Sequence, residues 1–446
     1  MEPSVFLDFR LPNAATWFYF SLILTVALFF QFTRLLSIRN LDLLMLFLLV
    51  PGFLLVQEAA VLEKAGHGGR AARERALGYG WLLTGSAHWF ARAVFDLVLV
   101  KRPAVSANMN IHGLSWLGIA LFVCLNAVAV RQTDQAPQEL VGNRPASIEQ
   151  MQNTATAVVE QAHSTNGGQA STETVQFWAA RGLAMLCHAA VLAGLVMIGW
   201  RHFGDLTAGV GAAALYTLLP YTAYNIGQYH HVLPTAFLVW AVFCYRRPTL
   251  AGWLLGLAAG TSVVPALLFP LWFGFFSRRG ASRFGLAFLT ATVASVGITA
   301  LVLWIGPSGL NLVTALHLTE WKPWTVPTGE SIWTGTHWAY RLPVFVLFVG
   351  FVAAVTFWPA PKNLSHLLAQ SAAVLIGIQF WHADRGGQYV LWYLPLLLLL
   401  VFRPNLSTAE PPAVVPGSVL ARWAGAAWRR VRRNEPQSPG SKPLAV

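Results

Sequence analysis

The sequence predicts an all-α, polytopic integral membrane protein with about 10 to 13 hydrophobic helices. Only 11% of its 446 residues are charged, 56% are hydrophobic and the mean hydropathy is +0.54, whereas soluble domains carry roughly 25% charged residues. Several apolar runs approach or reach the roughly 20 residues that cross a bilayer as a helix. The runs lack the alternation of a membrane barrel, and helices are the other structure that satisfies the backbone in lipid.

The apolar runs divide the chain into four regions. Residues 1–131 hold N-terminal membrane helices with an interfacial segment, 132–174 form a polar flexible loop, 175–403 form the membrane core, and 404–446 form a disordered basic tail. No cleavable signal peptide is expected, because the first apolar run is long and lacks a clear small-residue cleavage site. The runs that predict helices are 17–32, 41–56, 78–100, 114–130, 175–200, 206–224, 249–276, 284–304, 343–358, 367–381 and 389–402, with a further apolar run between His231 and Arg246.

The net charge of +12 arises from Arg and Lys at the ends of these runs and in the tail. This distribution is typical of cytoplasmic loops and of contact with anionic membrane lipids, so nucleic acid is not expected as a partner. Cys124, Cys187 and Cys244 all lie in apolar runs. A disulfide framework or a zinc site is therefore not expected.

The run 78–100 carries three ionisable residues, His88, Arg92 and Asp96. Because they are four residues apart, they share one face of a helix. Ionisable groups at membrane depth usually face a cavity or one another, so His88 and Arg92 are candidate substrate-binding residues and Asp96 a candidate catalytic base. Alternatively, the helix lies at the interface with Arg92 paired to Asp96. The positive-inside rule weakly favours this interfacial arrangement, with an inside N-terminus, over a spanning helix with an outside N-terminus.

Three polar segments of the second half are predicted to share the outer face. If Arg246, Arg247, Lys362 and Arg403 lie inside, and 249–276 enters and returns as a hairpin, the segments GQYHH (227–231), 306–340 and HADRGGQ (382–388) lie outside. The middle segment holds Trp321, Trp324, Trp333 and Trp338 with several charged residues. Its tryptophans suit an interfacial belt, and such rings can also stack on sugars.

The stretch GQYHHVLPTAFLVWAVFCYRRPTLAGWLLGLAAGTSVVPALLFP resembles a recurring segment of bacterial glycosyltransferase family 87. The resemblance covers about sixty of 446 residues and rests on Gln228, the RRP motif at 246–248, and Pro265 and Pro270. It implies the GT-C fold and a polyprenyl-phosphate-mannose-dependent mannosyltransferase of the cell envelope, in the inner (plasma) membrane of a bacterium. Two departures are Ser262, where the family commonly has lysine, and Asp42, a weak match to the acid of the first outer loop.

Transfer from a polyprenyl-phosphate sugar to a glycan or lipid acceptor needs a base for the acceptor hydroxyl, and cations or a metal for the phosphate. No cofactor is evident, and a divalent metal is left open. The candidate bases are Asp96, Glu320 and Asp384. Residues that could bind substrate are His88, Arg92, Gln228, His230, His231, Arg341, His382 and Arg385.

Each candidate also has a structural explanation. His230 and His231 could cap a span, Gln228 could bond between helices, and Asp384 with Arg385 could be a loop ion pair. The competing functions are a multi-span transporter, whose site would lie at broken helices such as 260–265, and a non-catalytic membrane protein of the same fold.

Overall fold

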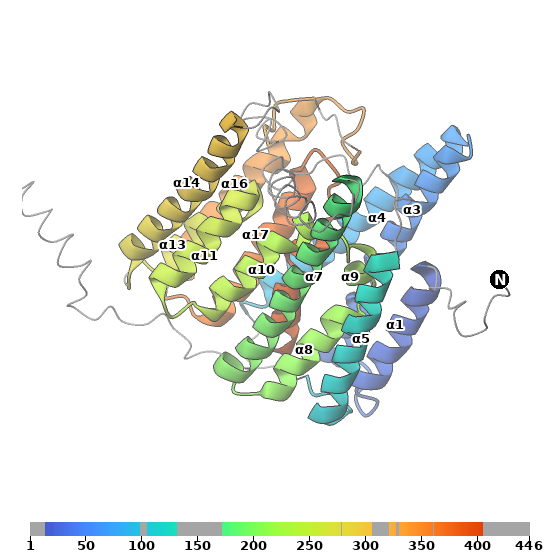
Figure 1. Ribbon diagram of the computed structural model, residues 1–446, viewed down its shortest axis with the longest axis horizontal. Helices are drawn as coiled ribbons and strands as arrows, with labels where there is room; N and C mark the ends of the chain where they lie inside the picture. Colours follow the sequence, from blue (N-terminus) through green and yellow to red (C-terminus); the bar gives the residue numbers. More distant parts are fainter. Residues whose placement is uncertain are drawn as a thin grey trace, which may run out of the picture. The chain divides into compact units, whose positions relative to one another are not determined.

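The computed structural model describes residues 14–98, 105–131, 172–277, 279–305, 321–326, 330–359 and 361–404. The chain forms two units, 1–411 and 412–446, and all described residues belong to the first. Every regular element within the described residues is helical, which confirms the predicted all-α class (Figure 1). Glu320, most of the 132–174 loop and nearly all of the 404–446 tail lie outside the described residues.

Long α-helices alternate with short helical turns along the chain. In the first half the elements are α1 (Ala14–Phe29), α2 (Ile38–Met45), α3 (Val50–Lys64), α4 (Gly68–Phe95) and α5 (Ile111–Arg131). The second half contains α7 (Thr172–Ile198), η2 (Gly199–Phe203), α8 (Leu206–Leu218), α9 (Pro220–Tyr224), α10 (Tyr229–Phe243), α11 (Pro248–Thr261), α12 (Val263–Ala266), α13 (Phe269–Phe275), α14 (Ala281–Ile305), η3 (Trp338–Tyr340), α16 (Leu342–Phe357), α17 (Leu364–Trp381), η4 (Val390–Trp392) and α18 (Leu394–Phe402).

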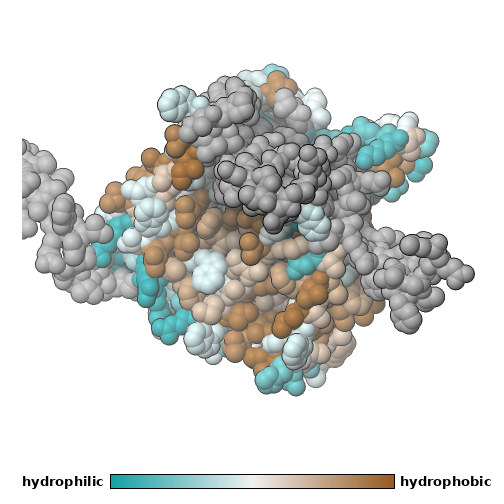
Figure 2. Space-filling view, viewed as in Figure 1, coloured by the Kyte–Doolittle hydropathy of each residue, from teal (hydrophilic) through white to brown (hydrophobic). Residues whose placement is uncertain are grey.

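Five of the described helical segments are long and apolar enough to cross a membrane: Ile38–Lys64, Ala180–Phe203, Ala281–Leu301, Trp338–Phe357 and Leu364–Trp381. The chain is therefore an integral membrane protein. Apolar side chains of α14 and α16 are exposed, as lipid contact requires, and brown residues dominate the middle of the described surface in Figure 2. The three cysteines carry free thiols, which agrees with the expectation of no disulfide.

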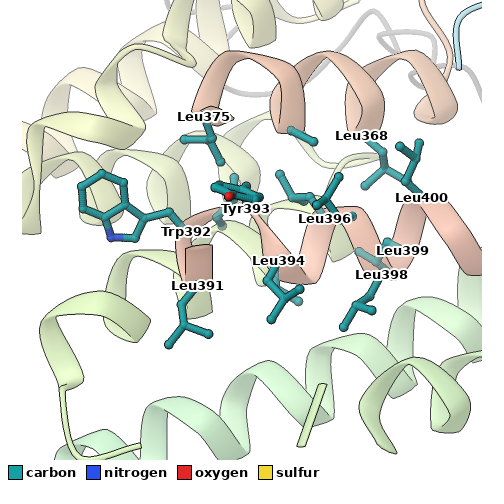
Figure 3. Packing of buried hydrophobic residues seen from close by; sticks show 14 of the residues in the cluster. Leu368, Leu375, Leu391, Trp392, Tyr393, Leu394, Leu396, Leu398, Leu399 and Leu400 are labelled. Carbon is teal, nitrogen blue, oxygen red and sulfur yellow. The ribbon is translucent and has the colours of Figure 1, made fainter. Parts of the chain in front are cut away.

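The centre of the described bundle is the pair α17 and α18. Both helices are buried almost throughout, and Figure 3 shows Leu394, Leu396 and Leu398 of α18 with Leu368 and Leu375 of α17 in one packed apolar cluster. α17 also packs against α4 and α16, and α18 packs against α8. The loop that joins α17 to α18 is thus held between two helices that are buried almost throughout.

The predicted hairpin over 249–276 is present as α11, a break at Ser262, and α12 with α13. Ser262 has an extended backbone and its hydroxyl caps α12 by accepting from the Val264 N–H at 3.4 Å. Both ends of the hairpin lie at the start of α14: a Cβ at Gly252 would meet Phe284 O at 2.5 Å, and the rings of Phe276 and Phe284 are 5.1 Å apart. The segment therefore enters and returns on one side.

Glycines spaced by four residues bring α11 against α14. Gly252, Gly256 and Gly260 form one stripe, and a Cβ at each would clash with Phe284 O, Phe288 O or Ser295 in turn. Small residues at this spacing let membrane helices approach closely, and packing is what drives their association in lipid. The glycines of the stretch that resembles family 87 thus belong to a structural helix pair, α11 with α14.

Replacing Gly256 by Ala should lower thermal stability, because the added methyl meets the backbone of α14 and overpacking costs about 1–3 kcal/mol. The matched control is Gly350→Ala on α16, where the methyl meets nothing within 4 Å and the helix propensity improves. Thermal unfolding of both variants in nanodiscs measures the difference. Equal stability of the two variants would mean that the glycine stripe does not hold this helix pair.

Candidate functional site

The three segments predicted to share one face do meet in space. The rings of His231 and Tyr389 are 5.3 Å apart, and those of Trp321 and His382 are 4.5 Å apart. The Arg385 N–H donates to Glu330 O at 2.7 Å. The co-location of the described parts of these segments, 227–231, 321–326 with Glu330, and 382–388, is therefore confirmed, and we refer to this end of the bundle as the site end.

The α17–α18 loop lies at the site end and packs against α4. The Gly387 N–H donates to the Gln379 side chain at 2.9 Å. Gly387 has φ +96°, and a Cβ at this position would lie only 2.7 Å from Leu82 Cβ of α4. Arg385 has φ +45°, a conformation that is uncommon for a residue with a side chain and often occurs at functional sites. The two glycines of HADRGGQ thus let the loop turn sharply against α4.

Polar side chains of this loop are bonded to one another and to α4. The Tyr389 hydroxyl donates to Asp384 Oδ2 at 3.3 Å, and the Gln388 amide donates to the Tyr79 hydroxyl oxygen at 3.1 Å. His382 Nδ1 lies 2.6 Å from Asp384 O. Asp384 and His382 are buried, so the carboxylate is held in a fixed position within a largely dehydrated environment. Such a carboxylate has the setting that a general base requires.

Charged groups surround this buried core. The charges of Glu330, Arg385, Asp384 and Arg75 all act on the Tyr79 hydroxyl. Arg75 bonds Glu63 and lies 3.4 Å from the Glu330 carboxylate. Burial lowers the pKa of Arg75, but the hydrogen bond to Glu63 and the charge of Glu330 outweigh burial and raise that pKa overall. The site end therefore combines carboxylates with guanidinium groups.

A second polar cluster lies at the opposite end of the same helices. Arg92 donates to both oxygens of Asp42, at 2.7 and 2.8 Å, and to Asp96 Oδ1 at 3.0 Å. Arg403, directly after α18, donates to Asp96 Oδ2. The side chain of Asp96 is 0% exposed and that of Arg403 is 4% exposed. We call this group, Asp42, Arg92, Asp96 and Arg403, the ionic cluster.

The two clusters are separated by most of the length of α4. Tyr79 and Asp96 are 17 positions apart, which corresponds to about 25 Å along a helix. α17 likewise runs from His366, near Asp96 and Arg403, to Gln379 at the site end. α4 packs along α17, which is long and apolar enough to span a membrane, whereas α4 is not among the described segments that meet this criterion. The interfacial arrangement of 78–100 therefore stays a prediction.

The structure sorts the predicted site residues into distinct groups. Five of them meet at the site end: Asp384, Arg385, His382, His230 and His231. Asp96 and Arg92 belong to the ionic cluster, and His88 lies close enough to be affected by its charges. The two described candidate bases therefore lie at opposite ends. The sequence could not show that Asp96 and Asp384 lie far apart. The spacing of His88, Arg92 and Asp96 places them on one face of α4, but it does not reveal which other elements lie beside each end of that helix.

Arg341 has a structural role in holding the tryptophan-rich segment. Its guanidinium donates to the backbone carbonyls of Lys322 at 2.8 Å, Thr325 at 3.1 Å and Pro323 at 3.4 Å. These bonds fix the strip that begins with Trp321, whose ring packs on His382. Arg341 thus positions a residue of the site end from α16.

Sequence reasoning missed several residues of the site end. Tyr79 and Glu330 were not singled out as site residues, and neither were Gln379, Gln388 and Tyr389. Gln388 and Tyr389 adjoin the HADRGG motif, so proximity to Asp384 was a usable signal. Tyr79 gave no such signal, because a tyrosine near the end of a membrane helix is ordinary. Among the described residues, no three His, Cys, Asp or Glu side chains are grouped closely enough to hold a metal ion.

Comparison with known proteins gives a partial similarity. No protein-family model matches the chain, and no solved structure matches it significantly. A glycerol-3-phosphate acyltransferase from Granulibacter bethesdensis (strain ATCC BAA-1260 / CGDNIH1) is 44% identical over 138 residues, which is 30% of this chain. The aligned part covers 55% of that acyltransferase, so the chain spans about half the length of this curated relative.

Asp96→Asn should destabilise the protein by about 3–5 kcal/mol, because removing the carboxylate charge leaves Arg92 and Arg403 buried with one charge too few. The control is Glu58→Gln, which neutralises an exposed carboxylate of α3. Thermal unfolding and the yield of monodisperse protein report the effect. A stable Asp96→Asn protein that has lost only turnover would instead assign Asp96 a chemical role.

Proposed function

We propose that this protein is a membrane-embedded transferase that moves a group from an activated donor to a hydroxyl at the site end. The observation that carries the proposal is the convergence of buried Asp384 with Arg385, His231 and Trp321 from three separate segments. A carboxylate beside guanidinium groups suits transfer to a hydroxyl in the presence of a phosphate. The partial similarity to an acyltransferase supports the same general class, a transferase.

In its finer form, the proposal is a GT-C-like glycosyltransferase that uses a polyprenyl-phosphate sugar, with mannose as the expected sugar. The resemblance of the stretch from Gln228 to Pro270 to family 87 supports this assignment. The site end would then face the outer side of a bacterial inner membrane, and the acceptor would be a glycan or a lipid. The basic residues near α10, α13 and α18 would face the cytoplasm.

The proposed reaction transfers the sugar in one displacement. The acceptor oxygen bonds to the anomeric carbon, the bond from that carbon to the phosphate oxygen breaks, and its electron pair leaves with polyprenyl phosphate. Asp384 takes the proton of the acceptor hydroxyl, while the Tyr389 hydroxyl donates to Asp384 Oδ2 and holds the carboxylate in place. Guanidinium groups stabilise the charge that grows on the phosphate.

A second candidate is acyl transfer to the hydroxyl of a glycerol phosphate. The 44% identity over 138 residues to a glycerol-3-phosphate acyltransferase favours it. The demands on the site are similar, since a hydroxyl must lose its proton beside a bound phosphate. The two candidates differ in the donor, which is an activated acyl group in one and a polyprenyl-phosphate sugar in the other.

Asp384→Asn should reduce turnover by about 10²-fold or more while thermal stability stays close to wild type, because general-base catalysis contributes that much. Purified protein in nanodiscs is supplied with polyprenyl-phosphate mannose or glucose and mixed acceptors, and released polyprenyl phosphate is followed by mass spectrometry. A parallel reaction contains glycerol 3-phosphate with acyl-thioester or acyl-phosphate donors.

Glu58→Gln is again the control, here for the loss of an exposed carboxylate outside the loop that carries Asp384. Sugar transfer supports the glycosyltransferase and acyl-ester formation supports the acyltransferase. Folded wild-type protein that acts on neither set of donors would contradict both and favour the transporter or non-catalytic alternatives.

A further inference from the structure

An arginine at the start of the apolar part of α7 lies against the GQ dipeptide. Arg181 is the second residue of the spanning segment Ala180–Phe203 and is partly buried. A Cβ added to Gly227 would overlap Arg181 Nη1 and lie 3.0 Å from Arg181 Nε. The absence of a side chain at position 227 thus makes the space that the guanidinium occupies.

Two unpartnered polar atoms lie in the segment that follows Gly227. Gln228 is the N-cap residue of α10, makes no side-chain capping bond, and has its Oε1 buried without a hydrogen-bond partner in the described part of the chain. His231, in the first turn of α10, is 7% exposed, and its Nδ1 also has no hydrogen-bond partner there. Buried polar atoms in native proteins are rarely left without a bond, so these atoms indicate a bound group.

A second guanidinium approaches the same turn from the α17–α18 loop. The Tyr389 ring of this loop lies 5.3 Å from the His231 ring. Arg385, four residues before Tyr389, is close enough for its charge to act on His231 and on Tyr224, at the end of α9. Gly227 lies between these two residues in the chain. α10 is 15 residues long, and its first turn adds the positive end of a helix dipole.

We propose that Arg181, Arg385 and the first turn of α10 form the phosphate-binding subsite of this protein. The proposal deepens the transferase function and rests on it for the identity of the substrate. Its ligand is a phosphate ester, either a polyprenyl-phosphate lipid or a soluble glycerol phosphate. A guanidinium fork binds two phosphate oxygens at once, and His231 contributes a further hydrogen bond from its ring.

The subsite accounts for the placement of the candidate base. Tyr389 links the base to this turn, because its hydroxyl donates to Asp384 Oδ2 at 3.3 Å and its ring lies 5.3 Å from that of His231. A phosphate held at the subsite would therefore bring the rest of the substrate near the carboxylate. The carboxylates near this subsite are Asp384 and Glu330, both of which act on Tyr79 together with Arg385. The phosphate would therefore bind to the positive groups, which are Arg181, Arg385 and the first turn of α10. The carboxylates would stay available to accept a proton.

Binding is tested directly, without turnover. Protein in zwitterionic nanodiscs is titrated calorimetrically with farnesyl phosphate and with glycerol 3-phosphate, and farnesol and glycerol are the neutral controls. Arg181→Gln should weaken binding of the phosphate probe about tenfold or more, because a hydrogen bond to a charged group is lost. Arg201→Gln, which removes an exposed arginine of η2, the turn that follows α7, should bind as wild type does.

Gly227→Ala perturbs the same guanidinium without removing its charge. In the wild-type background the methyl displaces Arg181 and should weaken binding, whereas in the Arg181→Gln background it should change binding little, because the clash is gone. If Gly227→Ala does not fold, Arg181→Lys takes its place, since it keeps the charge and loses the bidentate fork.

Preference for farnesyl phosphate identifies a lipid phosphate, and preference for glycerol 3-phosphate identifies a soluble one. The subsite is overturned if folded Arg181→Gln protein binds both phosphates as tightly as wild type does, or if wild type binds neither more tightly than the neutral controls. Phosphate binding that depends on Arg181, in a protein without turnover on any donor, would retain the subsite and reject the proposed transferase.

Discussion

The pairing of Asp96 with Arg92 and Arg403 is the interaction on which the arrangement of the bundle depends. It joins α4 to the end of α18, and through Asp42 it also joins α2. Charges buried in this way are stable only when every partner is present, since one missing partner leaves an uncompensated charge. The ionic cluster therefore fastens the end of α18 to the end of α4.

The rest of the site end follows from that anchoring. α17 and α18 are so thoroughly buried that their connecting loop has little freedom, and Gly387 presses the loop onto Leu82 of α4. α4 consequently reaches both clusters, contributing Tyr79 at one end and Arg92 with Asp96 at the other. One end of the helix carries bonds that hold the protein together, and the other end lines a site.

The lipid environment explains why the ionic cluster and the polar residues of the site end differ. Within the bilayer a charge must be neutralised by a partner, and the ionic cluster meets this condition with short bonds among its members. At the site end some buried polar atoms, such as His231 Nδ1, have no hydrogen-bond partner among the described residues. Buried polar atoms without a partner are expected where a ligand can bond to them. The ionic cluster, whose charged groups are paired, is therefore structural, whereas the site end has, among its described residues, the unpaired atoms of a binding site.

The sequence by itself determined the class of the protein, because low charge and long apolar runs depend only on composition and order along the chain. It also indicated, from the placement of basic residues, that 227–231, 306–340 and 382–388 share a face, which the contacts of His231, Trp321 and Arg385 bear out. Tertiary structure alone decided that Asp96 and Asp384 lie at opposite ends, and that Arg181 reaches Gly227. Periodicity places a side chain on a helix face, but only the packing of neighbouring helices decides which partner it meets.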